Sequence, residues 1–178
     1  MSDTEKLLQK FQLLAAKKPL GIDMTIIDPS MLYSETQKND QLKTKLTRFG
    51  QIFKELEGLK QFVAPYYKSN SDKIHSFRDA IFYNELVQIQ VFFEFIKDIQ
   101  TDPTTSPNLY HIFQKKTDLK LNKIRNSIAH FDWTLNNGAI IFRDKNFKIS
   151  VNYFEISEFC SLISMIAIFM TNNINKIE

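Results

Sequence analysis

The stretch IRNSIAHF, residues 124–131, decides how the rest of the chain is interpreted. An α-helix turns by about 100° per residue, so residues four apart share a face. The two isoleucines of the stretch, four apart, therefore form an apolar face suited to a core, and Asn126 and His130 share a second face. Arg125 lies about 140° from His130 around the axis, so its long side chain is needed to reach the histidine's surroundings. The stretch predicts a helix with one face in the core and a polar face presenting Arg, Asn and His.

The residues that follow change from a helical to a strand period. Asn136–Gly138 is a turn signal, and Ala139–Phe142 and Phe147–Val151 are short apolar runs on either side of a second turn. They predict a small β-hairpin, with Trp133–Leu135 as a candidate third strand. The segment Tyr153–Asn173 is then expected to form a last helix that is apolar almost all round. Such a helix is either central in a bundle or buried at a dimer interface.

Helical spacing of apolar residues also dominates the chain before the motif. Helices are expected over Thr4–Lys18, Thr36–Tyr67 and Lys73–Gln100. Ile22–Ser30 is expected to be a connector, and a shorter helix should run from a cap at 117–118 to about His130. The predicted fold class is therefore mainly α, a helical bundle with a small β-hairpin inserted before the last helix. Residues 1–30 are predicted to form an N-terminal helix and connector, and residues 31–178 the helical domain.

Composition limits the classes of protein that need to be considered. With 178 residues and 43% hydrophobic residues, the chain can bury a core within one domain. The single cysteine, Cys160, excludes an internal disulfide and a Cys-cluster metal site, and its apolar helical surroundings favour a small buried residue over a catalytic thiol. The polar, acidic start of the chain does not resemble a secretory signal, and the longest apolar run, Phe159–Met170, is short for a membrane span. We expect a cytoplasmic protein without membrane association.

The net charge of +3 is mildly basic and compatible with nucleic-acid contact. Basic residues gather just before and within the motif helix, at Lys115, Lys116, Lys120, Lys123 and Arg125. A charge run of this kind is often only a solvated helix face. The alternative is an anion-binding surface, in which Lys120 and Lys123 would bind substrate.

Arg125, Asn126 and His130 together suit phosphodiester chemistry. A guanidinium binds phosphate through a planar fork and offsets the charge that develops on its oxygens. An imidazole can take a proton from a 2′-hydroxyl or give one to a leaving oxygen, and an amide can orient either group. This chemistry requires no metal ion and no cofactor, and the sequence shows no carboxylate cluster for a metal.

Structural roles are the alternative explanation of the same residues. Arg125 could form a salt bridge with Asp132 or Asp118, and His130 could simply interact with the helix macrodipole at a C-terminus. Glu85, among apolar neighbours, is either a buried partner of Arg125 or a residue of an exposed face. The sequence leaves these alternatives open.

The eight residues 124–131 resemble the motif of the HEPN superfamily (higher eukaryotes and prokaryotes nucleotide-binding domain), in which Arg and a polar residue precede a His late in a helical bundle. The resemblance implies a metal-independent ribonuclease whose two motif helices meet across a homodimer axis. It would make His130 the general acid or base, Arg125 the phosphate ligand and Asn126 a supporting residue. HEPN toxins paired with nucleotidyltransferase antitoxins carry Tyr two residues after the His, where this chain has Asp132, so control by tyrosine modification is not implied.

Three hypotheses follow. The first is a homodimeric endoribonuclease that cuts RNA by attack of the 2′-hydroxyl, in a toxin or phage-defence role, with an antitoxin or regulatory protein as a further partner. The second is a non-catalytic HEPN-type module that binds a nucleotide or a protein, because some family members retain only the fold. The third is a structural dimerisation protein, in which Arg125 and His130 are buried and paired within one protomer.

Overall fold

The computed structural model describes residues 2–68, 74–101, 119–136 and 139–174. These ranges contain six α-helices and a three-stranded sheet, as the sequence predicts. The helices are α1 (Asp3–Ala15), α2 (Pro29–Gln37), α3 (Asp40–Lys68), α4 (Ile74–Thr101), α6 (Leu119–Ala129) and α7 (Tyr153–Ile174). The strands, β1 (Trp133–Asn136), β2 (Ala139–Asp144) and β3 (Phe147–Asn152), lie between α6 and α7.

Local capping determines where the first helices begin. Ser2 and Glu5 form a capping box on α1, in which Ser2 Oγ accepts from the Glu5 amide at 3.2 Å and Glu5 Oε2 accepts from the Ser2 amide at 2.6 Å. Asp28 Oδ1 accepts from the Ser30 amide at 2.8 Å, and Pro29 occupies the first turn of α2. The prediction of a connector over Ile22–Ser30 is therefore wrong at its end, where α2 begins.

The prediction of one helix over Thr36–Tyr67 is wrong at its start. Helix α2 ends at Gln37 and α3 begins at Asp40. Asn39 separates them because its Oδ1 accepts from the Gln41 amide at 2.8 Å and from the Leu42 amide at 3.3 Å, which starts a new helix in a new direction. Residues 34–41 are all polar, so apolar spacing does not locate a helix boundary within this segment.

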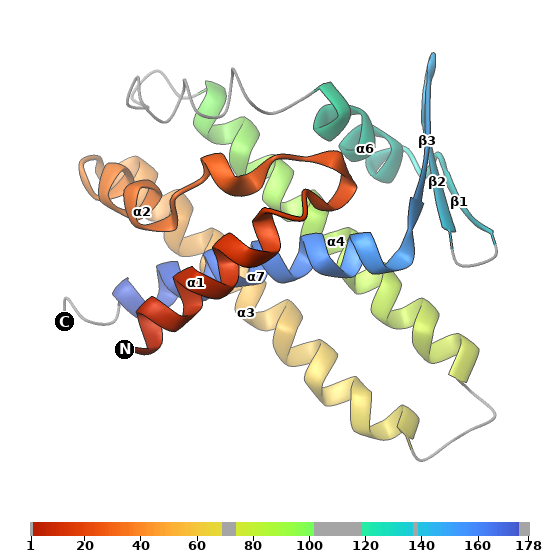
Figure 1. Cartoon of the computed structure of the whole chain (residues 1–178), viewed down its shortest axis with the longest axis horizontal. Helices are drawn as coiled ribbons and strands as arrows, with labels where there is room; N and C mark the ends of the chain where they lie inside the picture. Colours follow the sequence, from red (N-terminus) through yellow and green to blue (C-terminus); the bar gives the residue numbers. More distant parts are fainter. Residues whose placement is uncertain (1, 69–73, 102–118, 137–138, 175–178) are drawn as a thin grey trace.

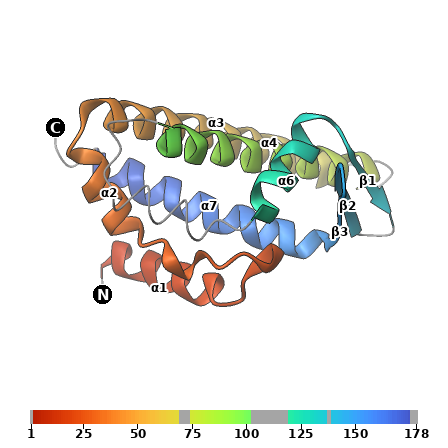
Figure 2. The same cartoon turned by 90° about the horizontal axis from the view of Figure 1, so that it is seen from above.

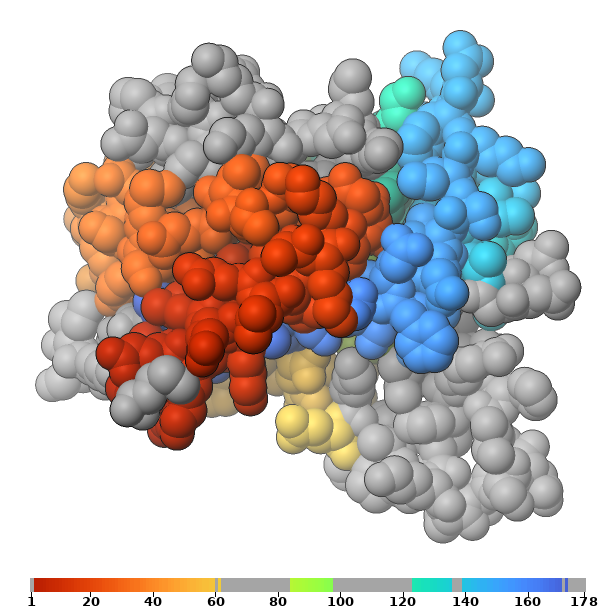
Figure 3. All heavy atoms as spheres, in the orientation of Figure 1, coloured from red at the N-terminus to blue at the C-terminus, as the bar shows by residue number. Residues whose placement is uncertain are grey.

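The helices pack in layers around α7. Helices α3 and α4 lie side by side and contact one face of α7, while α1 contacts its other side (Figures 1 and 2). The space-filling view shows the segment from α1 to α2 covering one face of the molecule, with the sheet at the side (Figure 3). Of the two environments predicted for the last helix, the structure therefore has the central one.

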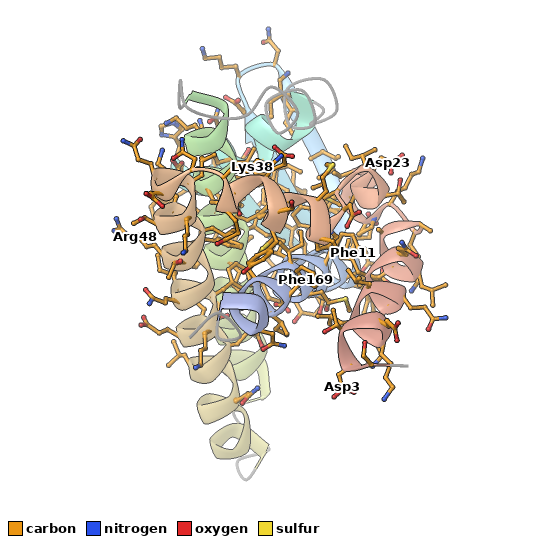
Figure 4. The ribbon with its side chains drawn as sticks, turned by 90° about the vertical axis from the view of Figure 1, so that its left-hand side faces the viewer. Asp3, Phe11, Asp23, Lys38, Arg48 and Phe169 are labelled. Atoms are coloured by element: carbon orange, nitrogen blue, oxygen red, sulfur yellow. The ribbon has the colours of Figure 1, made fainter. Side chains whose placement is uncertain are left out.

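Large apolar side chains fill the space between these layers. Phe53 of α3, Phe92 of α4 and Phe159 of α7 are at most 1% exposed, and the Phe92 and Phe159 rings meet edge to face at 6.2 Å. Phe11 of α1 belongs to the same core, and Figure 4 shows Phe11 and Phe169 in the interior while Arg48 lies outside. Cys160 is buried at 2% exposure, as predicted. The N-terminal helix thus shares its core with the rest of the bundle.

Helix α7 is the most apolar element. Its 18 residues Tyr153–Met170 have a mean hydropathy of 1.5, enough in length and composition to cross a membrane, and half of them are buried within the fold. The core helix of a bundle can have the same length and hydropathy, so these values fit both a bundle core and a membrane span. The absence of membrane association stays a prediction.

The sheet is an antiparallel meander in the order β1-β2-β3, so the expected hairpin is present and Trp133–Leu135 does form a strand. Its register pairs Trp133 with Phe142 and Ile140 with Val151. Ile140, Phe142 and Val151 are buried and belong to the main core. Helix α6 packs on β2, which places the motif at the junction of bundle and sheet (Figure 2).

Candidate active site

Helix α6 is fixed between α4 and the sheet. Ile124 and Ile128 are 0% and 9% exposed, which confirms that one face of the motif helix is in the core. Ser127 is 1% exposed, and its Oγ lies within hydrogen-bond distance of the Lys123 and Arg143 carbonyl oxygens. The hydroxyl has one proton, so it donates to one of these oxygens at a time. The serine between the two isoleucines thereby attaches α6 to β2.

Arg125 and Asn126 form a single hydrogen-bonded unit. Arg125 Nη2 and Nε donate to Asn126 Oδ1 at 2.7 and 3.2 Å, and Asn126 Nδ2 donates to Asp144 Oδ2 at 3.1 Å. Because the amide accepts from the guanidinium and donates to a carboxylate, both of its ends are oriented. Asn126 thus holds the fork of Arg125 in one position relative to the sheet.

The third nitrogen of the guanidinium faces α4. Arg125 Nη1 is 3.7 Å from Glu94 Oε1, which also accepts from Gln90 Nε2 at 3.1 Å. The Arg125 side chain is 22% exposed and that of Glu94 48% exposed. An ion pair this long and this open to water contributes little to stability, so an anionic ligand can compete for the guanidinium. Arg125 pairs with Glu94, and neither Asp132 nor the buried Glu85 is its partner; Asp118 lies outside the described residues.

His130 lies at the end of α6, where the helix stops in a Schellman motif. The Phe131 amide donates to Ile128 O at 3.2 Å and the Asp132 amide to Ser127 O at 2.8 Å, with Phe131 in the left-handed region at φ 55°. The His130 side chain is exposed, and its imidazole makes no hydrogen bond or ion pair with the described part of the chain. The hypothesis of a purely structural role predicts a buried and paired His130, whereas the structure has this side chain exposed.

The structure joins Arg125 and Asn126 by hydrogen bonds, and among the described residues the His130 side chain makes no hydrogen bond to either of them. Lys123 lies on the sheet side of the helix, with Nζ 5.1 Å from the centre of the Phe147 ring. Seven residues separate Lys123 from His130, so the two share one side of α6. Lys120 also belongs to α6, but its side chain is outside the described residues. The substrate-binding role of both lysines stays a prediction.

Three polar residues of this site were not found from the sequence: Gln90, Glu94 and Asp144. They lie far from the motif in the chain and reach it only through the packing of α4 and β2 on α6. Glu94 did leave a signal, since it is a lone carboxylate in the aromatic segment VFFEFI, residues 91–96.

A cleft of about 420 Å³ between α3 and α4 adjoins the site, because Glu94 lines it. Phe49, Ile52, Val91 and Phe95 are its apolar residues, and Lys45, Arg48 and Gln90 its other polar ones. Lys45 and Arg48 of α3 thus line the same cleft as Glu94, the carboxylate that faces the Arg125 guanidinium. Within the described ranges, no three His, Cys, Asp or Glu side chains gather as metal ligands.

The arrangement can do two things chemically. An oriented guanidinium that is partly open to water can bind a phosphate, and an exposed imidazole at neutral pH can transfer a proton. No protein-family model, curated protein or solved structure matches this chain, so the functional assignment depends on the geometry and on the motif.

Proposed function

We propose that the chain is a metal-independent endoribonuclease of HEPN type that acts as a homodimer. The observation that carries the proposal is the Arg125–Asn126 unit, in which the amide fixes the guanidinium while His130 stands exposed at the end of the same helix. A fixed cation and an exposed imidazole are the two groups that cleavage by the 2′-hydroxyl requires.

The proposed reaction begins with removal of the 2′-hydroxyl proton by a neutral His130 imidazole. The 2′-oxygen attacks the adjacent phosphorus, and the bond from phosphorus to the 5′-oxygen of the next nucleotide breaks. Protonation of that oxygen, by an imidazolium or by water, yields a 2′,3′-cyclic phosphate and a 5′-hydroxyl. Arg125 would exchange its weak contact with Glu94 for the phosphate oxygens, where charge increases in the transition state.

A dimer would explain how two groups on different faces serve one phosphate. Arg125 and His130 are separated by about 140° around α6, and no contact joins them within the described protomer. In a two-fold dimer of motif helices, the guanidinium of one protomer would face the imidazole of its partner. A toxin or phage-defence role, with an antitoxin or regulatory protein as partner, completes the proposal.

The test is cleavage of single-stranded RNA in EDTA by the wild type and by Arg125→Ala and His130→Ala. Each substitution should lower kcat/KM by about two to four orders of magnitude, the usual contribution of a general base or of a charge-stabilising group. Lys10→Ala, which removes an exposed cation of α1, is the matched control and should cleave as the wild type does. Activity that survives both motif substitutions in a folded protein would remove the proposal.

A mixing experiment separates a composite site from two independent ones. Arg125→Ala and His130→Ala proteins, combined after dissociation, would form heterodimers in which one complete site is restored. About a quarter of wild-type activity is expected, because about half of the dimers are mixed and one of the two sites in each mixed dimer has both native residues. If the re-associated mixture stays inactive while the wild type cleaves RNA, the proposal of a site shared between protomers is wrong and each protomer cleaves RNA with its own Arg125 and His130.

A second candidate is a non-catalytic module that binds an anionic ligand, and one observation favours it. Two of the three guanidinium nitrogens of Arg125 already donate to Asn126, so the fork is partly occupied before any phosphate arrives. This function predicts binding of nucleotide or partner protein that Arg125→Ala abolishes, with no cleavage of RNA by the wild type. The same EDTA assay distinguishes it from the first proposal.

A further inference from the structure

Phe131 is the most exposed large apolar side chain among the described residues, at 82%. It follows His130 directly and lies at the boundary between α6 and β1. A phenylalanine left in water forgoes the stabilisation that burial of its ring would give. At this exposure little of the ring packs against its own chain, so its position does not serve the core.

The backbone of Phe131 adds a second cost. Its φ of 55° lies in the left-handed region, where a side chain meets the following carbonyl and where glycine is the usual residue at a helix C-terminus. Backbone hydrogen bonds hold it there: the Phe131 amide donates to Ile128 O at 3.2 Å, and the amide of the next residue, Asp132, donates to Ser127 O at 2.8 Å. The fold therefore holds the backbone of an exposed phenylalanine, next to His130 in the chain, in a conformation where glycine would be more stable.

The neighbouring face of the sheet is basic. The register places Arg143 directly opposite Lys148. On its other side the Arg143 amide donates to the Asp132 carbonyl, so Asp132, Arg143 and Lys148 form one row across the sheet. Like charges directly opposite each other in a sheet are destabilising, and the single carboxylate of the row offsets only one of them. An anion on this face would relieve the repulsion between the two cations.

We infer that Phe131 is a base-stacking platform for single-stranded RNA, with Arg143 and Lys148 binding the adjoining phosphates; the inference rests on the proposed ribonuclease function. Unpaired bases stack on exposed aromatic rings while cations follow the backbone, and this is how single strands are commonly held. Stacking would place the nucleotide beside His130, so Phe131 positions the substrate and takes no part in proton transfer. Arg143 and Lys148 favour a polyanion as the occupant of this face, and a second copy of the chain is distinguished from RNA by the oligomeric state of the Phe131 variant.

Phe131→Gly gives the sharpest test, because glycine suits the left-handed backbone and the variant should fold at least as stably as the wild type. Its KM for single-stranded RNA should rise about 5- to 100-fold, the range for loss of one stacked base, with kcat at saturation nearly unchanged. Phe131→Trp should restore a KM near the wild-type value. Phe154→Ala, at another exposed phenylalanine (73%), is the matched control and should leave KM unaltered.

Each result bears on a distinct claim. A wild type that cleaves RNA and a Phe131→Gly variant with unchanged KM would overturn the stacking role and leave the ribonuclease intact. A Phe131→Gly variant that becomes monomeric in sedimentation would show that the ring contacts a second copy, which also overturns it. A wild type that does not cleave RNA removes the ribonuclease and this inference together. In the His130→Ala background, weaker binding of a labelled single strand by Phe131→Gly and by Arg143→Ala would support the inference without any turnover.

Discussion

Asn126 Nδ2 donates to Asp144 Oδ2 at 3.1 Å, so the residue that orients Arg125 is itself held by the second strand of the sheet. The site is therefore built from α6, α4 and β2, and only α6 carries residues of the motif. This contact makes Asp144 a positioning residue for the guanidinium.

Asp144→Ala should weaken both the fold and the proposed activity. Loss of the acceptor leaves a half-buried amide unpaired, and we expect the free energy of unfolding to fall by about 1–2 kcal/mol. Urea denaturation of Asp144→Ala, Asn126→Ala and the double variant gives the coupling energy, which should be clearly different from zero. Lys145→Ala, at the exposed neighbouring position, is the control. Additive effects of the two substitutions would contradict the contact.

Ser127→Ala should be costly despite its small change in size. The side chain is 1% exposed, and its hydroxyl lies within hydrogen-bond distance of the carbonyl oxygens of Lys123 and Arg143. We therefore expect the free energy of unfolding, measured by urea denaturation, to fall by about 1–3 kcal/mol. Ser161→Ala is the matched control, since this serine donates to Ser157 O at 2.9 Å on an exposed helix face. Alanine there should change stability by less than about 0.5 kcal/mol. Equal effects at both positions would show that the α6–β2 contact is not needed.

Gly58→Ala should stabilise the protein. A Cβ at position 58 would meet no atom within 4 Å, and alanine is favoured over glycine inside a helix by about 1 kcal/mol. For a chain of this size the melting temperature should rise by about 2–4 °C in calorimetry. Leu59→Ala, next to it and 54% exposed, should change the melting temperature much less. A lower melting temperature for Gly58→Ala would mean that α3 is not helical at this point.

Asp23 should make stability depend on pH in the acid range. Hydrogen bonds from Thr25 and then from Lys18, whose Nζ lies 3.1 Å from Asp23 Oδ2, hold the pKa of the Asp23 carboxyl below its usual value of 3.8. A lowered pKa in the folded state means that the charged form favours folding. The contribution is present above the unfolded pKa and is lost as the pH falls through the folded one.

Asp23→Asn should therefore be less stable than the wild type at pH about 6, and the difference should shrink as the pH falls through the lowered folded-state pKa of Asp23. Urea midpoints across this range provide the measurement. Thr25→Val, which removes the strongest of these hydrogen bonds, should reproduce part of the effect. A difference that is constant with pH would exclude the charge as its cause.

Local rules allowed most of the fold to be predicted. The spacing of apolar residues indicated the helices, and the turn at Asn136–Gly138 between apolar runs indicated the strands, because both signals depend on neighbours in the chain. The break between α2 and α3 was missed because residues 34–41 are all polar, so apolar spacing gives no boundary there and only the cap at Asn39 marks the new helix.

The motif could be found from the sequence, but its partners could not. The sequence left Asp132, Asp118 and Glu85 open as partners of Arg125, and it did not indicate Glu94, which the packing of α4 on α6 brings to the guanidinium. Likewise, nothing near Asn126 in the sequence identifies Asp144 as its partner. Asp144 is the last residue of β2, and the packing of β2 on α6 brings it to Asn126. The left-handed Phe131 was equally hidden, since φ at a helix end depends on the bonds that close the helix.

The two bonds from α6 to β2 have a mechanical consequence. Ser127 binds the Arg143 carbonyl and Asn126 binds the Asp144 side chain, so consecutive residues of the helix are attached to consecutive residues of one strand. Such a pair resists rotation of the helix about its own axis, which a single bond would permit. The direction in which Arg125 points is therefore set by the tilt of the sheet, and a load on the outer strands would be transmitted to the guanidinium as a torque.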